Sequence, residues 1–135
     1  MFSLTRAELQ AITEFVLVLE KEFGADLLGV VLYGSKARGD DQQDSDIDLL
    51  VIMPDDTWPT RQKISHSSAA VSLGYEVLLM PKIVSLAHWQ RMAADPFSFY
   101  RFLFQDGLPV YGKPAIFAPL AQRKRTPLYE TAVTA

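Results

Sequence analysis

Cysteine is absent from the 135 residues of this chain. Its absence excludes disulfide bonds, catalysis by a thiolate and cysteine-ligated zinc sites together. The sequence also lacks a signal peptide and an apolar run of membrane-spanning length. A cytoplasmic protein is therefore the expectation.

A surplus of basic residues is missing as well. The chain has 13 Lys and Arg against 16 Asp and Glu, a net charge of −3, and no basic stripe interleaved with aromatics. This composition disfavours a polymerase that tracks along DNA or RNA. Hydrophobic residues make up 49% of the chain and charged residues 21%. Those proportions are typical of a globular domain that buries a sizeable core.

A Gly-Ser turn follows the first short apolar run. Residues Leu27–Tyr33 are predicted to form a buried strand that stops at Gly34, where the missing Cβ lets a phosphate approach the backbone. Ser35 can open a short helix through Arg38, and its free N–H groups favour an anion. A strand–turn–helix corner without a ligand would use the same residues. A Walker P-loop is excluded, because Asp40 replaces the lysine that must reach the phosphates.

A pair of carboxylates opens the next apolar run. Asp46 and Asp48 are two residues apart, so on a strand both point to one face, ahead of the apolar residues Leu49–Met53. Such like charges repel each other and are costly to desolvate unless a cation neutralises them. Hard oxygen ligands suit Mg²⁺ or Mn²⁺. Other acidic residues nearby are interpreted as a solvated loop: Asp40, Asp41 and Asp44.

Together these residues form a recognisable signature. Gly34-Ser35, ten residues and then Asp46-x-Asp48 resemble the G-S-x10-D-x-D motif of the DNA polymerase β-like nucleotidyltransferases, and in particular their minimal nucleotidyltransferase (MNT) branch. The resemblance implies an α/β (α+β) fold with a small mixed sheet flanked by helices. It also implies that the carboxylates bind Mg²⁺ or Mn²⁺, that ATP is the substrate, and that Gly34, Ser35 and Arg38 bind its phosphates.

No second helical domain, such as related enzymes use to bind an acceptor, is visible in the sequence. An MNT domain without one is similar to the antitoxin of HEPN/MNT toxin–antitoxin pairs. The resemblance then implies transfer of AMP from ATP to a tyrosine hydroxyl of a partner HEPN ribonuclease. Two further hypotheses stay open: a transferase for a small hydroxylated molecule, and a module that blocks its partner by binding alone.

A third carboxylate is expected from a third strand, Tyr75–Met80, ended by Pro81. Glu76 lies near the start of this strand among apolar neighbours, an unlikely place for a carboxylate with no task. The resemblance implies that a carboxylate at this position completes the metal site and accepts the proton of the attacking hydroxyl. Alternatively, Glu76 reaches solvent or pairs with Arg38.

Apolar periodicity and capping residues predict the remaining elements. Thr5 and Glu8 form a capping box for the first helix, and His66 and His88 are interpreted as surface residues. Residues 1–113 are expected to form the domain, and residues 114–135 a tail that is loosely docked or mobile. The predicted helices are Ser3–Phe23, Pro59–Leu73, Ser85–Asp95 and Pro96–Gln105, followed by a turn and a short extended segment at 106–112.

Overall fold

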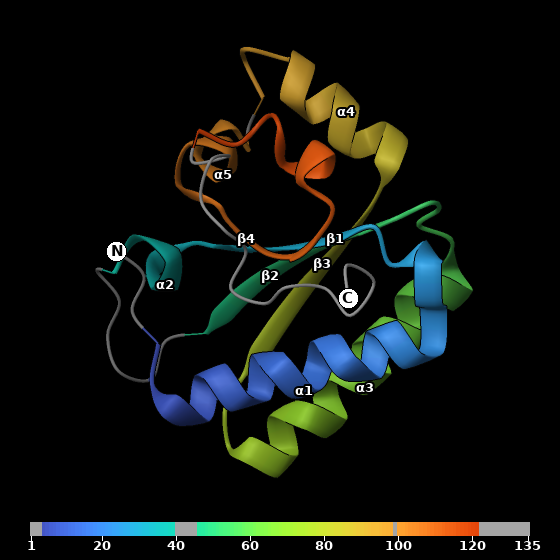
Figure 1. Ribbon diagram of the computed structural model, residues 1–135, viewed down its shortest axis with the longest axis vertical. Helices are drawn as coiled ribbons and strands as arrows, with labels where there is room; N and C mark the ends of the chain where they lie inside the picture. Colours follow the sequence, from blue (N-terminus) through green and yellow to red (C-terminus); the bar gives the residue numbers. More distant parts are fainter. Residues whose placement is uncertain (1–3, 40–45, 99, 122–135) are drawn as a thin grey trace.

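The computed structural model describes residues 4–39, 46–98 and 100–121, which form a four-stranded mixed sheet between two layers of helices (Figure 1). The strand order is β3-β2-β1-β4. Strand β1 (Gly29–Tyr33) pairs antiparallel with β2 (Ile47–Met53) and with β4 (Leu108–Gly112), and β2 pairs parallel with β3 (Leu79–Ser85). The predicted α/β fold with a small mixed sheet is therefore confirmed.

Each face of the sheet packs against its own set of helices. Helices α1 (Arg6–Phe23) and α3 (Trp58–Tyr75) cover one face, and α4 (Leu86–Ala94) and α5 (Arg101–Asp106) cover the other (Figure 1). Alternate residues of β2 supply the two cores, as the two-residue period of a strand requires. Leu49 and Val51 pack under α1 and α3, whereas Leu50 and Ile52 pack under α4 and α5. Short helical turns fill the connections: η1 (Gly24–Asp26), α2 (Ser35–Arg38) and η2 (Pro114–Phe117).

Helix α1 begins at the predicted capping box. The backbone N–H of Thr5 donates to Glu8 Oε1 at 2.8 Å, and the N–H of Glu8 donates to Thr5 Oγ1 at 3.1 Å. Two N–H groups that lack partners within the helix are thereby satisfied. Gly24 caps the other end of the helix at a positive φ of 56°. The helix was expected to begin at Ser3, but Thr5 is its N-cap and Arg6 its first residue. Residues 1–3 lie outside the described residues.

The third strand lies further along the chain than predicted. Helix α3 continues to Tyr75, Glu76 caps it in the left-handed conformation, and β3 runs over Leu79–Ser85 rather than 75–80. Pro81 was expected to end the strand but lies inside it. The expectation was wrong because β3 is the edge strand of the sheet, where a proline is tolerated if its nitrogen faces away from the partner strand.

Hydrogen bonds along β3 show why Pro81 fits. Ile47 N–H donates to the carbonyl of Leu78 at 2.9 Å, so the backbone groups of Leu78 face β2. Those of Leu79 face the opposite way. Its N–H donates to Ser72 Oγ at 3.0 Å, and its carbonyl accepts from Ser68 Oγ at 3.2 Å. Two residues further on, the nitrogen of Pro81 also points outward, where no ladder hydrogen bond is lost.

The predicted helix Pro96–Gln105 forms only in its second half, as α5. Asp95 ends α4 instead of opening a new helix, and its side chain accepts from the N–H of Phe97 at 2.9 Å. Ser98 likewise accepts from the N–H of Tyr100 at 3.1 Å. Local hydrogen bonds of this kind offer the backbone an alternative to the helix. They explain the turn between α4 and α5.

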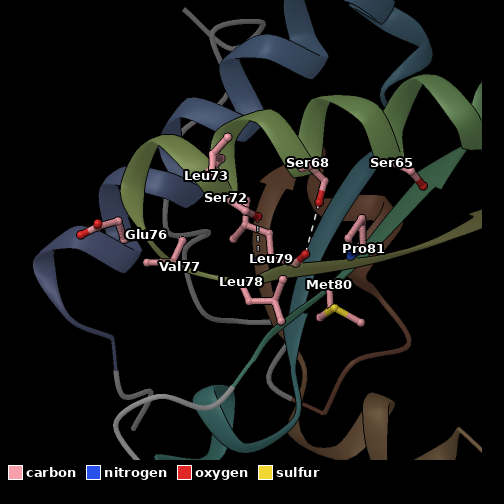
Figure 2. A pocket seen from close by; sticks show the side chains of 11 residues that line it. Ser65, Ser68, Ser72, Leu73, Glu76, Val77, Leu78, Leu79, Met80 and Pro81 are labelled. Carbon is pink, nitrogen blue, oxygen red and sulfur yellow. Dashed lines mark hydrogen bonds between the residues drawn. The ribbon is translucent and has the colours of Figure 1, made fainter.

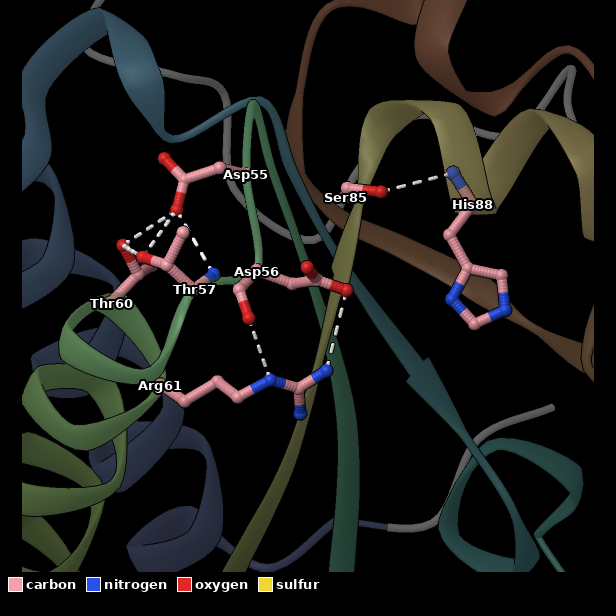
Figure 3. Close-up of polar contacts among 7 residues, drawn as sticks. All are labelled: Asp55, Asp56, Thr57, Thr60, Arg61, Ser85 and His88. Atoms are coloured by element: carbon pink, nitrogen blue, oxygen red, sulfur yellow. Dashed lines mark hydrogen bonds and ion pairs between the residues drawn. The ribbon is translucent and has the colours of Figure 1, made fainter.

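Polar residues at the start of α3 and α4 have structural tasks (Figure 3). Asp55 accepts from the backbone and hydroxyl of Thr57 at 3.1 and 2.8 Å and from the hydroxyl of Thr60 at 3.0 Å. Ser85 caps α4 by accepting from the N–H of His88 at 3.1 Å. Ser85 thus satisfies a free N–H of α4, whereas Asp55 fixes Thr57 and Thr60 at the start of α3.

The packed chain continues past residue 113, where the tail was expected to begin. Phe117 and Leu120 are buried in the core under α4 and α5. Trp89 Nε1 donates to the carbonyl of Ile116 at 3.0 Å. Residues 122–135 lie outside the described residues. Within the described part of the chain, no helix combines the length and apolar character needed to cross a membrane.

Candidate functional site

Asp46 and Asp48 lie where β2 begins, at one end of the sheet. Asp46 is exposed and directly precedes the strand, and Asp48 is half-buried within it. Asp48 is paired in register with Tyr33 of β1 and with Met80 of β3. Strand alternation places Asp48 on the face shared with Leu50 and Ile52. The carboxylate therefore opens toward the α4/α5 side of the sheet.

The surroundings of Asp48 disfavour the charged form of its carboxyl group. Burial raises the pKa of the Asp48 carboxyl above its ordinary value, and the negative charge of Asp46 raises it further. The guanidinium of Arg38 acts in the opposite direction and lowers this pKa. A bound cation would relieve both the desolvation and the repulsion.

Gly34 is in direct contact with this carboxylate. It follows β1 with φ 77° and ψ −158°, a backbone conformation that is almost restricted to glycine. A Cβ at this position would collide with Oδ2 of Asp48. Glycine is thus required both by the backbone and by the space beside Asp48. The fold brings the predicted turn and the predicted carboxylates together.

Helix α2 continues the turn. Gly34 takes the N-cap position, so Ser35 is the first helical residue rather than the cap that was predicted. Gly39 closes the helix at φ 80°, and its N–H donates to the carbonyl of Ser35 at 2.9 Å. Arg38 is exposed, and its effect on the pKa of Asp48 places its charge within reach of the carboxylates. The turn, the short helix and Arg38 thus follow directly on the strand that pairs with the start of β2.

A buried ion pair that sequence reasoning missed joins α2 to α1. Lys36 Nζ lies 2.6 Å from Glu8 Oε2, and the two side chains are 1% and 7% exposed. Glu8 is also the capping-box residue of α1. The sequence identified Glu8 only as a cap, because nothing in its spacing reveals a partner 28 positions along the chain. The pair holds α2, and with it the Gly34 turn, against the start of α1.

Glu76 does not join Asp46 and Asp48. It is the exposed C-cap of α3, with φ 55° and ψ 41°, and lies three positions before β3 begins (Figure 2). Opposite Asp48, strand β3 instead carries Met80. Among the described residues, no group of three His, Cys, Asp or Glu side chains is arranged to hold a metal ion. The strand placement of Glu76 was wrong, and its predicted metal and proton-accepting roles depended on that placement.

Three aromatic side chains lie next to one another near Asp48, and one of them, Tyr33, is in register with it. The Tyr33 ring lies 6.3 Å from that of Phe102, which lies 6.3 Å from Tyr100. Burial raises the pKa of Tyr33 to about 12, with further contributions from the charge of Asp48 and from Tyr100. The sequence contains several aromatic residues near position 100, but it does not reveal that two of them lie beside Tyr33. At neutral pH the Tyr33 hydroxyl stays protonated and can donate a hydrogen bond.

The residues present fit a divalent cation that carries phosphates. Mg²⁺ in proteins commonly takes one or two carboxylates and completes its shell with water and substrate phosphate oxygens. Asp46 and Asp48 supply such carboxylates, and burial together with the charge of Asp46 disfavours an uncompensated charge on Asp48 by raising its pKa. Gly34 has no Cβ, so the backbone of the turn lies next to the Asp48 carboxylate with no side chain of its own between them. A metal-bound polyphosphate matches this donor set.

Comparisons with known proteins place the chain in a family. A family model described as "Nucleotidyltransferase domain" matches residues 12–91. Two relatives from Methanocaldococcus jannaschii are named as protein adenylyltransferases. MJ0141 is 40% identical over 55 residues, covering 40% of this chain and 56% of the relative. MJ0604 is 42% identical over 45 residues, covering 33% and 45%. The chain thus spans about half the length of these curated relatives.

A solved structure shares the fold. It is described as a mutant of the toxin-antitoxin MntA-HpeT and superposes with a TM-score of 0.51 over 76% of this chain and 74% of that chain. The sequence identity is 13%. This likeness extends to the arrangement of the sheet and helices.

Proposed function

Because the chain belongs to the nucleotidyltransferase domain family, we propose that it is an antitoxin that transfers AMP from ATP to a tyrosine hydroxyl of a cognate HEPN ribonuclease toxin. The observation that carries this proposal is the contact of the Gly34 turn with Asp48, next to Asp46. The names of the relatives, protein adenylyltransferases, support AMP as the transferred group. The toxin–antitoxin description of the structural neighbour is consistent with a toxin as partner.

Each site residue has a role in this proposal. Asp46 and Asp48 would hold Mg²⁺ or Mn²⁺. Gly34 and Ser35 would present backbone N–H groups to the outer phosphates, and Arg38 would add positive charge beside them. The bound cation would neutralise phosphate charge and orient the triphosphate. The ion pair between Lys36 and Glu8 holds the turn against helix α1.

In the proposed reaction the acceptor oxygen forms a bond to the α-phosphorus of ATP. The bond from this phosphorus to the bridging oxygen breaks, and pyrophosphate leaves in line with the attack. The proton of the acceptor hydroxyl passes to solvent water. Met80 lies opposite Asp48, so no carboxylate of β3 stands there to take the hydroxyl proton. Tyr33 remains protonated and cannot act as the base at neutral pH. The described residues therefore contribute by positioning and charge stabilisation.

Because β3 carries Met80 and not a carboxylate opposite Asp48, a second candidate function is inhibition of the toxin by binding alone. A ribonuclease assay of the toxin separates the two functions. AMP transfer requires ATP and Mg²⁺, so a substoichiometric amount of the chain should silence the toxin only when both are present, and Asp48→Asn should not silence it. Inhibition by binding alone would need stoichiometric chain, would proceed without ATP, and would survive Asp48→Asn.

A further inference from the structure

A groove outside the carboxylate site runs along the free edge of the sheet. It has a volume of about 680 Å³ and lies between the second half of α3 and the first residues of β3 (Figure 2). Ser68, Ser72 and Leu73 line it from the helix, and Leu78 and Met80 line it from the strand side. Nothing in the proposed reaction uses this groove.

Large apolar side chains are exposed along the groove. Leu73 is 83% exposed, Leu78 51% and Met80 44%. Single exposed apolar residues are ordinary, but several that line one hollow indicate a binding surface. Covering them would remove apolar area from water and so favour binding.

The backbone of β3 does not offer this groove for strand addition. The outward N–H and C=O of Leu79 already pair with Ser72 and Ser68. Pro81, the next residue facing outward, has no N–H to donate. Along this stretch an added β-strand would find only the carbonyl of Pro81 as a partner, which is too little for a ladder of hydrogen bonds. An occupant must bind through side chains, as an amphipathic helix does in an apolar groove.

Charge further defines the occupant. Glu76 is the one charged residue among those that line the groove, and its exposed side chain lies at the rim. A basic side chain next to the apolar stripe of an incoming helix would complement it. Because this contact is at the solvated rim, it would guide orientation more than affinity.

Met80 connects the groove to the carboxylate site. It lines the groove and is also the residue of β3 in register with Asp48. The two side chains lie on the same face of the sheet, because residues in register on neighbouring strands share a face. A segment that binds in the groove and covers Met80 would therefore reach the side of the sheet on which Asp48 lies.

We propose that this groove binds an amphipathic helix of the protein acceptor, with apolar side chains on Leu73 and Leu78 and a basic side chain beside Glu76. The inference rests on the proposed function, since it assumes a protein acceptor. It assigns the groove the task of holding the acceptor while its hydroxyl reaches the nucleotide.

A matched pair of variants tests the groove. Leu73→Glu places a charge in it, whereas Leu17→Glu makes the same change at a leucine of α1 that is 53% exposed and does not line the groove. Titration calorimetry with the HEPN-type toxin, without ATP, should show Kd raised about tenfold or more for Leu73→Glu and nearly unchanged for Leu17→Glu. Glu76→Arg should raise Kd more than Glu76→Gln. Equal Kd values for the two leucine variants would overturn the groove proposal.

The outcomes separate the groove from the reaction. If Leu73→Glu loses affinity while wild type adds no AMP to the toxin, the groove stands and the proposed function fails. If AMP is transferred and Leu73→Glu leaves both Kd and the KM for the toxin unchanged, the groove fails and the function stands. If wild type does not bind the toxin, the groove proposal is overturned, and protection of the chain by ATP with Mg²⁺ then tests the nucleotide site separately.

Discussion

At the residue scale, Asp48 sets the electrostatics of the site. Its raised pKa means that the folded state holds this proton more tightly than the unfolded chain does. The resulting contribution to stability is present below the ordinary pKa of 3.8 and is lost as the pH rises through the raised value. At neutral pH and without metal, the ionised Asp48 therefore lowers the free energy of unfolding.

Asp48→Asn should consequently abolish transfer and divalent-ion binding without lowering Tm in metal-free buffer at neutral pH. Its Tm should equal or exceed that of wild type, because burial and the repulsion from Asp46 no longer act on a charge. The difference in Tm should narrow as the pH falls toward 3.8. Thermal unfolding at several pH values and a metal titration measure both effects. Full transfer activity in this variant would exclude the proposed metal site.

Gly34→Ala tests the turn, with Gly24→Ala as its control. Both glycines have positive φ values, 77° and 56°, but a Cβ at Gly24 meets nothing within 4 Å, whereas at Gly34 it collides with Asp48. Backbone strain alone should lower the free energy of unfolding by about 1–3 kcal/mol in either variant. Only Gly34→Ala should also lose the thermal protection that ATP with Mg²⁺ gives. If folded Gly34→Ala keeps the full thermal protection by ATP with Mg²⁺, the turn is a strand–turn–helix corner that binds no phosphate.

The sequence predicted some of these residues and not others. Gly34, Asp46 and Asp48 stood out because a fixed spacing links a turn to a pair of carboxylates that a buried strand does not otherwise tolerate. Met80 could not be placed opposite Asp48, because that position depends on the register of two strands separated by a helix. Glu76 was misplaced because helix α3 continues to Tyr75, so that Glu76 caps this helix and does not lie in a strand.

At the element scale, the Lys36–Glu8 ion pair holds α2 against α1. Lys36→Met should lower the free energy of unfolding by about 3–5 kcal/mol, because it leaves the Glu8 carboxylate buried without its cation. The double variant Lys36→Met/Glu8→Gln should recover part of this loss, since the uncharged amide still accepts from Thr5. Denaturant unfolding of the single and double variants gives the comparison.

The exposed pair Arg61–Asp56 serves as its control. Their side chains are 44% and 40% exposed, and the contact is 3.3 Å long. Arg61→Met should change the free energy of unfolding by less than about 1 kcal/mol. A similarly small effect for Lys36→Met would show that the buried pair does not fix the turn.

Elements with strong local signals were predicted well. The capping box of α1 and the continuous apolar run of β2, which is buried on both faces, follow from nearest neighbours along the chain. The extent of β3 does not, because Pro81 is compatible with a strand only at a sheet edge, and the edge is set by the order β3-β2-β1-β4. The shortening of α5 likewise depends on side-chain bonds of Asp95 and Ser98 that compete with the helix.

At the scale of the whole molecule, the fold class was predictable and the arrangement of parts was not. The resemblance of the Gly34-Ser35 and Asp46-x-Asp48 signature to nucleotidyltransferases implied a small mixed sheet flanked by helices, which the structure has. The groove at the edge of the sheet forms only when α3 and β3 pack together, so no sequence pattern predicted it. The packing of Phe117 and Leu120 under α4 and α5 also depends on long-range contacts.

The central claim is that this arrangement transfers AMP to a protein. Intact-mass measurement of the HEPN-type toxin after incubation with the chain, ATP and Mg²⁺ tests it most directly. The account predicts a mass gain of one AMP on the toxin, mapped to a tyrosine, and no gain with Asp46→Asn or without Mg²⁺. An unchanged toxin mass under conditions in which the chain silences the ribonuclease would contradict it.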